Sequence, residues 1–184
     1  MAGLPATGKT RLATSLARRL DAVLVQVDAI ERAIVGAGIW RNEATRTASY
    51  ASTVAVARAN LSNGLSVVID AINSRTETRA LWTDLADELH VDHAFVVTTC
   101  SDRAEHERRI KSAHAGVDGQ PLTWDQLIEL NMKTAFWGDE PRVTIDTAKP
   151  VDIDQIVASV QDCATHESAA PVTAPRHTPR RAQV

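Results

Sequence analysis

Residues 3–10 read Gly3-Leu4-Pro5-Ala6-Thr7-Gly8-Lys9-Thr10 and match the pattern G-x-x-x-x-G-K-[ST] in full. Glycines in this pattern let the backbone bend so that successive N–H groups converge on phosphate oxygens. Lys9 is expected to reach the β- and γ-phosphates, and the hydroxyl of Thr10 is expected to be a ligand of Mg²⁺. The stretch therefore predicts a P-loop in which all of these residues contribute to binding ATP and Mg²⁺.

The residues after the P-loop predict an α/β fold. Leu12, Leu16 and Leu20 repeat every four residues, which predicts a helix that begins in the P-loop and ends near Asp21. Apolar, β-branched stretches predict strands at residues 23–28, 65–70, 93–99 and 142–146. Strands that alternate with helices favour a parallel sheet covered by helices on both faces.

The helices between these strands have recognisable ends and faces. One is expected to bury Tyr50, Val54, Ala57 and Leu61 and to end at Asn63-Gly64. Four others are expected to open with a capping residue followed three positions later by Glu or Gln, at Ser74-Glu77, Asp102-Glu105, Thr123-Gln126 and Asp152-Gln155.

Length and composition indicate one domain. The 184 residues are 44% hydrophobic, which is enough for one core, and we assign residues 1–167 to a single domain that contains the P-loop. Two glycines and a proline predict a mobile loop at residues 115–122. Residues 168–184 are rich in Ala, Pro, Thr and Arg without periodicity, so we predict a disordered C-terminal tail.

Charge and hydropathy disfavour several classes of partner. The net charge of −3 disfavours a nucleic acid partner, because no broad cationic field is present. No apolar run reaches the length of a membrane span, and the N-terminus lacks the features of a signal peptide. We therefore expect a cytoplasmic protein that does not bind membranes, with Cys100 and Cys163 reduced.

Two carboxylates at expected strand ends are candidates for the chemistry. Asp70 closes the strand at residues 65–70, where a second ligand for Mg²⁺ is expected, although such an aspartate can also start a turn. Asp28 closes the strand at residues 23–28 and could accept a proton from an attacking hydroxyl. The alternative for Asp28 is an N-cap of the helix that follows, and one residue could do both.

The order of the motifs resembles a known family. The P-loop is followed by Val-Asp-Ala-Ile-Glu at 27–31, Val-Val-Ile-Asp-Ala at 67–71, Cys-Ser-Asp at 100–102 and Ile-Asp-Thr at 145–147. With Arg108 and Arg109, this order resembles the small P-loop kinases over roughly residues 3–160. Within them the sequence is most similar to the group of chloramphenicol phosphotransferase and the zeta toxins, which has an AAA-type ATP-binding kinase domain, and polynucleotide kinase is more distant.

The resemblance implies a five-stranded sheet, a helical lid at about residues 103–122 and roles for individual residues. It implies that Asp28 is the general base and that Arg108 and Arg109 stabilise the transferring phosphoryl group. Both arginines could instead form solvated ion pairs with Glu105 and Glu107. A further lid arginine is often found one turn later, where this chain has Lys111, Ser112 and His114.

The acceptor pocket expected on this basis lies near Ile39 and Tyr50. Its candidate substrate-binding residues are Trp40, Arg41, Asn73 and Arg75, together with Asp28. Trp40 could stack on a ring of the substrate or pack in the core, and packing is slightly favoured.

These observations favour an enzyme that transfers the γ-phosphate of ATP to a hydroxyl of a small metabolite or antibiotic. A 5′-polynucleotide kinase and a non-catalytic ATP-binding regulator are the alternatives. The sequence does not identify the phosphate acceptor or the oligomeric state.

The first strand is expected to be truncated. Only Met1 and Ala2 precede Gly3, whereas a P-loop normally follows a buried strand of about five residues. We therefore predict that this strand cannot form in full, and we hypothesise that the natural chain starts upstream.

Overall fold

The structure is a computed structural model that describes residues 1–112, 123–132, 137 and 140–167. The predicted loop at 115–122, the second part of the predicted lid, His114 and the predicted tail at 168–184 lie outside the described residues. The elements in chain order are β1 (Ala2–Gly3), α1 (Lys9–Arg19), β2 (Val23–Gln26), α2 (Val27–Gly36), α3 (Glu43–Ser62), β3 (Val67–Asp70), α4 (Thr76–Leu89), β4 (Phe95–Thr99), α5 (Arg103–Ser112), α6 (Trp124–Met132), β5 (Arg142–Asp146) and α7 (Ile153–Glu167).

All paired strands are parallel, as the sequence predicts. One group has the order β1-β4-β5, and the other consists of β2 and β3. The two groups meet at β1, where the Met1 amino group donates to the Ile69 carbonyl at 2.7 Å and the Gly3 N–H donates to the Ile72 carbonyl at 3.4 Å. The five strands therefore lie side by side with β1 between β3 and β4, and β1 is only two residues long.

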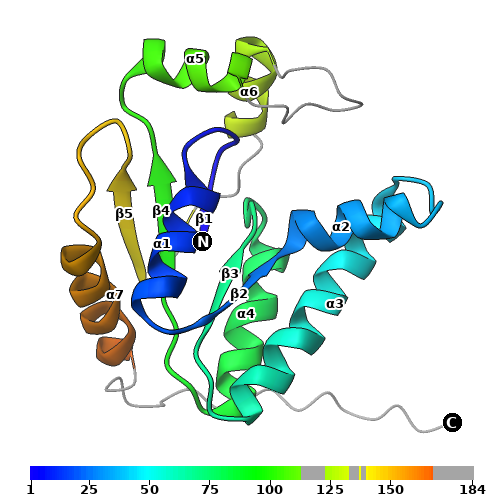
Figure 1. Ribbon diagram of the computed structural model, residues 1–184, viewed down its shortest axis with the longest axis vertical. Helices are drawn as coiled ribbons and strands as arrows, with labels where there is room; N and C mark the ends of the chain where they lie inside the picture. Colours follow the sequence, from blue (N-terminus) through cyan, green and yellow to red (C-terminus); the bar gives the residue numbers. More distant parts are fainter. Residues whose placement is uncertain (113–122, 133–136, 138–139, 168–184) are drawn as a thin grey trace, which may run out of the picture.

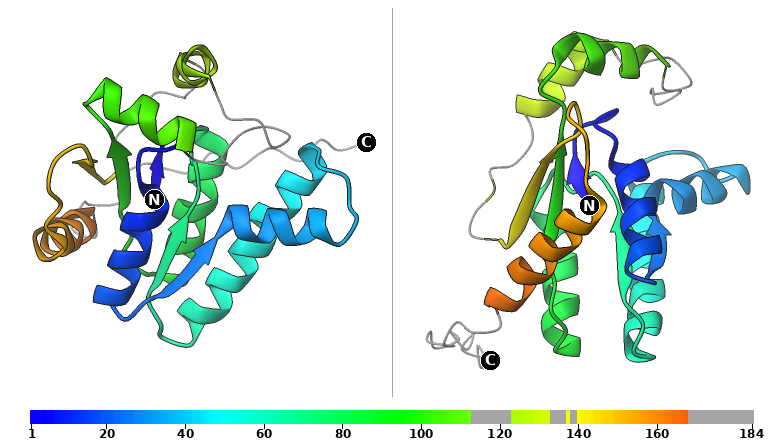
Figure 2. Two further views of the ribbon diagram at one scale, coloured as in Figure 1. Left: turned by 45° about the horizontal axis from the view of Figure 1, so that its top comes forward. Right: turned by 60° about the vertical axis from the view of Figure 1, so that its left-hand side comes forward.

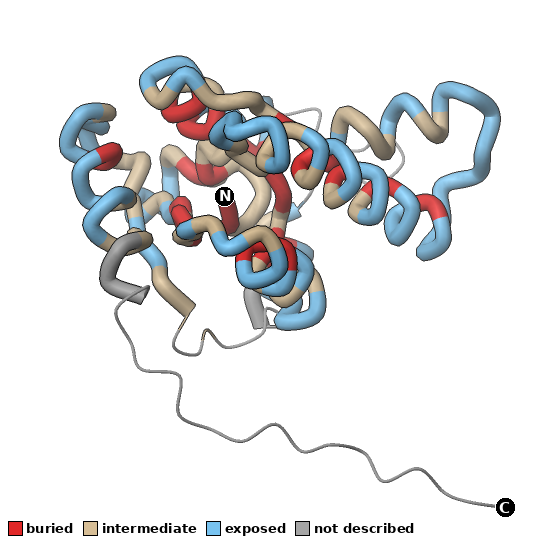
Figure 3. The backbone as a smooth tube through the Cα atoms, turned by 90° about the horizontal axis from the view of Figure 1, so that it is seen from below, coloured by how far each residue is buried: buried red, intermediate tan, exposed pale blue. Residues whose placement is uncertain are grey.

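Helices cover both faces of the strands, which makes the fold an α/β P-loop fold. Leu12 and Leu16 of α1 pack in one cluster with Val96 of β4 and Ile156 of α7, so α1 and α7 share a face. Helix α4 lies on the opposite side of the strands from α1 (Figure 2). Burial is concentrated around β1 and α1, whereas α2 and the start of α3 project outward, and Val27 is the one buried residue of α2 (Figure 3).

Three of the four predicted caps are confirmed. Asp102 accepts from the Glu105 N–H, Thr123 and Gln126 cap each other, and Asp152 accepts from the Gln155 N–H. The capping box predicted at Ser74 is wrong, because α4 begins only at Thr76 and its N-cap residue, Arg75, makes no side-chain cap bond.

The buried face of α3 differs from the predicted one. Thr45, Ser49, Thr53 and Ala57 are buried, and of the predicted set only Ala57 is fully buried. Helix α3 packs against both α2 and α4, and small side chains allow the close approach. No helix in the described part of the chain is both long and apolar enough to cross a membrane.

Candidate active site

The P-loop is a tight turn between β1 and α1. Gly3 has φ +133°, and a Cβ there would lie 2.4 Å from the Thr98 carbonyl oxygen, so only glycine fits without displacement. Ala6 and Gly8 also have positive φ values, 60° and 88°. Helix α1 begins at Lys9 with Gly8 as its N-cap residue, so the positive end of the helix lies at the loop.

Lys9 is folded back over the loop. Its ammonium group donates to the Leu4 carbonyl at 2.8 Å. Burial lowers the pKa of Lys9 from its ordinary value, while the charges of Asp70 and Asp28 act in the opposite direction. The site therefore holds a partly desolvated cation with two carboxylates nearby.

Thr10 and Asp70 are brought together as the sequence predicts. The Thr10 hydroxyl donates to Oδ2 of Asp70 at 2.6 Å, and the amide of Gln26 donates to the same oxygen at 3.3 Å. Parallel pairing of β2 with β3 places Gln26 opposite Asp70. A hydroxyl and a carboxylate are oxygen ligands of the kind that Mg²⁺ prefers, so this pair fits the predicted metal.

Asp28 lies neither at a strand end nor at an N-cap, so both predicted placements are wrong. Strand β2 ends at Gln26, which is the N-cap residue, and Asp28 is an exposed residue in the first turn of α2. Its charge raises the pKa of Lys9 and of Tyr50, although burial is the larger influence on both groups. The charge of Asp28 thus acts on two side chains at the site.

Helix α5 lies over the P-loop and carries the two predicted arginines (Figure 1). Arg108 is mostly exposed and pairs with Glu105, which is the solvated ion pair considered as an alternative. Arg109 also pairs with Glu105, but it reaches further and donates to the Thr147 hydroxyl at 2.8 Å and to the Thr147 carbonyl at 2.9 Å. Hydrogen bonds from both arginines lower the pKa of Glu105 to about 2.

The predicted acceptor residues are scattered. Trp40 is 86% exposed, so the expectation that it packs in the core is wrong. Arg41 pairs with Glu31 at 3.3 Å, and the exposed Arg75 lies 3.6 Å from each of its two acidic partners, Glu43 and Glu77.

Asn73 is buried, and its amide is bonded on both sides. Its nitrogen donates to the Met1 carbonyl at 2.8 Å, and its oxygen accepts from the Trp82 indole at 2.9 Å. Tyr50 packs against Trp82, with 6.1 Å between the ring centroids. Asn73 therefore joins β1 to α4 and contributes to the wall of the site through its buried position.

A cavity of about 570 Å³ opens beside the P-loop at the carboxyl ends of β1, β3 and β4. Its lining residues come from the P-loop, the β3–α4 connection, β4 and the residue after it, α5, the segment before β5 and the first residue of β5: Gly3, Leu4, Thr7, Ile72, Asn73, Ser74, Val97, Thr98, Thr99, Cys100, His106, Trp137 and Arg142. Sequence reasoning did not single out His106, Trp137 or Arg142. Their proximity depends on the packing of distant segments, and no local motif indicates it.

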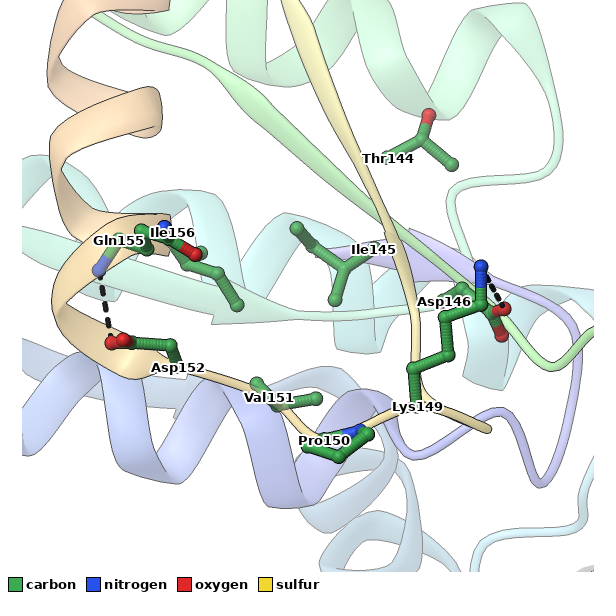
Figure 4. A pocket seen from close by; sticks show the side chains of 9 residues that line it. All are labelled: Thr144, Ile145, Asp146, Lys149, Pro150, Val151, Asp152, Gln155 and Ile156. Atoms are coloured by element: carbon green, nitrogen blue, oxygen red, sulfur yellow. Dashed lines mark hydrogen bonds and ion pairs between the residues drawn. The ribbon is translucent and has the colours of Figure 1, made fainter.

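A second cavity of about 210 Å³ lies where β5 turns into α7 (Figure 4). Asp146, Lys149 and Asp152 line it, and none of the P-loop residues 3–10 belongs to its lining. Hydrogen bonds from Ser101 hold the Asp146 carboxylate and lower its pKa to about 2. This cavity is therefore separate from the candidate phosphate site.

Comparisons with known proteins agree with this fold. A putative kinase from Chloroflexus aurantiacus superposes with a TM-score of 0.65 and 20% identity over 92% of this chain and 97% of that chain. The APS kinase of Mycobacterium tuberculosis in complex with AMPPNP and APS superposes with a TM-score of 0.59 and 22% identity over 88% of this chain and 93% of that chain. A gluconokinase from Sinorhizobium meliloti superposes with a TM-score of 0.58 and 14% identity over 90% of both chains. At these identities the structures establish a shared fold.

The family comparison covers the P-loop and most of the elements around it. No curated protein sequence matches this chain. The finer resemblance to chloramphenicol phosphotransferase and the zeta toxins stays a prediction. The family model described as AAA domain matches residues 1–130, which is well over half of the sequence, and the chain therefore belongs to the AAA domain family.

Proposed function

We propose that this protein is an ATP-dependent kinase that transfers the γ-phosphate to a hydroxyl of a small molecule. The observation that carries the proposal is the meeting of Lys9, Thr10 and Asp70 at one P-loop, with Thr10 and Asp70 joined at 2.6 Å. A cation and a pair of oxygen ligands beside a helix N-terminus are the arrangement that a triphosphate with Mg²⁺ requires.

In this proposal the P-loop residues 3–10 bind the phosphates. Backbone N–H groups and the N-terminus of α1 face the phosphate oxygens, and Lys9 leaves the Leu4 carbonyl to contact the β- and γ-phosphates. Thr10 and Asp70 would hold Mg²⁺, which supplies positive charge against the charge of the phosphate oxygens.

The transfer step uses Asp28 as the base. The acceptor hydroxyl oxygen bonds to the γ-phosphorus, the bond from that phosphorus to the β,γ-bridging oxygen breaks, and its electron pair leaves with ADP. The hydroxyl proton passes to Asp28, whose carboxylate makes no hydrogen bond or ion pair within the described residues. Arg108 and Arg109 are the proposed sources of further positive charge on the transferring phosphoryl group. Arg109 donates to the Thr147 hydroxyl, which in turn donates to the Thr7 carbonyl of the P-loop.

The acceptor site is proposed at the 570 Å³ cavity beside the P-loop. Its volume lies in the range of small-molecule sites, and its wall combines apolar side chains with Asn73, Ser74 and Thr98. Asp28, Trp40, Arg41 and Arg75 lie outside its lining. Asp28 would therefore act as the base only if the first turn of α2 moved toward the cavity, and the other three residues would contribute only if their own segments did so. The net charge of −3 favours a small molecule over a polynucleotide.

The test is transfer of labelled γ-phosphate from ATP to a panel of acceptors. Small alcohols, sugars and hydroxyl-bearing antibiotics form one arm, with chloramphenicol included because of the resemblance above. A 5′-hydroxyl oligonucleotide forms the second arm, and no acceptor forms the third. Transfer to a small acceptor supports the proposal. Transfer to the oligonucleotide alone would indicate a polynucleotide kinase, and ATP binding without any transfer would indicate a nucleotide-binding regulator.

A further inference from the structure

In the P-loop before Gly8, three carbonyl groups accept hydrogen bonds from side chains. The Leu4 carbonyl accepts from Lys9 and from the Thr7 hydroxyl, both within the loop. The carbonyls of Pro5 and Thr7 are different, because their donors come from residues more than 100 positions away. These two long-range contacts need an explanation beyond the local turn.

The donor to the Pro5 carbonyl is His106 of α5. Its Nε2 lies 2.9 Å from the carbonyl oxygen. A carbonyl oxygen only accepts, so Nε2 carries the proton in this contact. The ring is 4% exposed and packs edge-on against Trp124 of α6 with 5.6 Å between centroids, which holds its orientation.

The donor to the Thr7 carbonyl is the hydroxyl of Thr147, which lies 2.7 Å from that oxygen and 3.0 Å from the Thr99 carbonyl, so the Thr7 contact is the shorter of the two. Thr147 follows β5, and its own N–H donates to the Thr99 carbonyl at 2.9 Å, which anchors it to the end of β4. Arg109 donates to both oxygens of Thr147. Thr147 is therefore itself held from two sides.

Binding a carbonyl also sets the direction of the next N–H group. A trans peptide is planar, so its C=O and N–H point in opposite directions, and the described chain contains no cis peptide bond. The Pro5 carbonyl shares its peptide plane with the Ala6 N–H, and the Thr7 carbonyl shares its plane with the Gly8 N–H. Within the described residues neither N–H donates to a protein acceptor.

We propose that His106 and Thr147 are positioning residues that aim the Ala6 and Gly8 N–H groups at the phosphates. His106 would orient the Ala6 N–H by holding the Pro5 carbonyl, and Thr147 would orient the Gly8 N–H by holding the Thr7 carbonyl. Ala6 has φ 60°, a conformation that costs energy for alanine, so an external contact that maintains it has a clear physical use. The inference rests on the phosphate-binding part of the proposed function.

The test combines nucleotide titration with residue-specific amide signals. Mg²⁺-ADP and Mg²⁺-pyrophosphate are titrated into the ¹⁵N-labelled full chain and into the variants His106→Ala and Thr147→Val. In His106→Ala we expect roughly tenfold weaker binding of both probes, which is the effect of losing about one hydrogen bond to a charged group. The shift of the Ala6 amide signal on binding should shrink, whereas that of Gly8 should remain. Thr147→Val should show the reverse pattern.

Two controls separate positioning from folding. His106→Gln keeps an N–H donor of similar reach and should restore most of the affinity. Ile110→Ala removes a buried side chain one turn further along α5 and should lower the melting temperature without changing the affinity. Equal affinities in the unmodified chain and in His106→Ala and Thr147→Val would overturn the inference alone. Absence of binding in the unmodified chain would overturn the proposed function and the inference together.

Discussion

The Thr10 hydroxyl donates a 2.6 Å hydrogen bond to Oδ2 of Asp70, which joins the start of α1 to the end of β3. The two residues are 60 positions apart in the sequence. Asp70 is 7% exposed, and Gln26 donates to the same carboxylate oxygen. Within the described part of the chain two side chains donate to this carboxylate, which leaves it oxygen lone pairs for another partner, in our account Mg²⁺.

Asp70→Asn should therefore raise the Mg²⁺ concentration needed for half-maximal nucleotide binding by at least about tenfold, because a neutral amide replaces an anionic oxygen ligand. The measurement is ATP affinity as a function of Mg²⁺, with thermal melting to confirm the fold. An unchanged Mg²⁺ requirement would show that Asp70 is not a metal ligand.

Asp28→Asn should lower kcat by roughly 10²-fold with little effect on ATP affinity, because it removes the proposed base and nearly preserves the side-chain shape. The matched control is Glu31→Gln, which neutralises a carboxylate one turn further along α2 that pairs with Arg41. Steady-state kinetics with the acceptor found in the screen provide the comparison. Equal turnover in both variants would remove Asp28 from the mechanism.

Gly3→Ala should destabilise the protein by about 2 to 3 kcal/mol, because the added methyl group would meet the Thr98 carbonyl and the backbone conformation disfavours alanine. Gly36→Ala is the control, since Gly36 lies in helix α2 with open space around a Cβ, and it should be neutral or stabilising by up to about 1 kcal/mol. Urea unfolding measures both changes. Similar stabilities of the two variants would contradict the close approach at Gly3.

Asp146 should titrate well below an ordinary aspartate. Hydrogen bonds from the Ser101 side chain and N–H lower its pKa from 3.8 to about 2. Because the folded-state pKa is the lower one, the resulting stability is present above about pH 4 and is lost as the pH falls toward 2. Ser101→Ala should raise the pKa toward 3.8, as measured by ¹³C NMR titration of the carboxyl group. A pKa near 4 in the unmodified protein would contradict the contact.

Local patterns predicted the elements that carry the phosphate site. The P-loop, α1, Asp70 at the end of β3 and strand 142–146 follow from motif and apolar periodicity, because each depends on neighbours in the sequence. The predicted strand at residues 23–28 extends two residues beyond the end of β2 at Gln26, because apolar Val27 continues the strand pattern. In the structure Val27 is buried as the first residue of α2. The predicted start of α4 at Ser74 lies too early in the chain. Asn73 has φ 50° and its amide is hydrogen-bonded to Met1 and Trp82, so the helix begins only after it, at Thr76.

The remaining features of the site depend on contacts between distant segments. The bond from His106 to Pro5 spans 101 positions, and the one from Thr147 to Thr7 spans 140. Neither residue type signals such a contact, since a histidine on a charged helix reads as a surface residue. Exposure of Trp40 likewise depends on how α2 and α3 project from the sheet (Figure 3). The positions of these side chains depend on tertiary packing, which local composition and periodicity do not predict.

The central claim, a P-loop that binds ATP through Lys9, is tested most directly by calorimetry of Mg²⁺-ATP binding to the unmodified chain and to Lys9→Ala. Burial lowers the pKa of Lys9, which means that its charge costs folding energy in the free protein. Lys9→Ala should therefore leave the melting temperature unchanged or raise it, while ATP affinity falls by at least about tenfold because the cation that faces the phosphates is gone. Equal ATP affinity in the two proteins, or no ATP binding by the unmodified chain, would contradict the account.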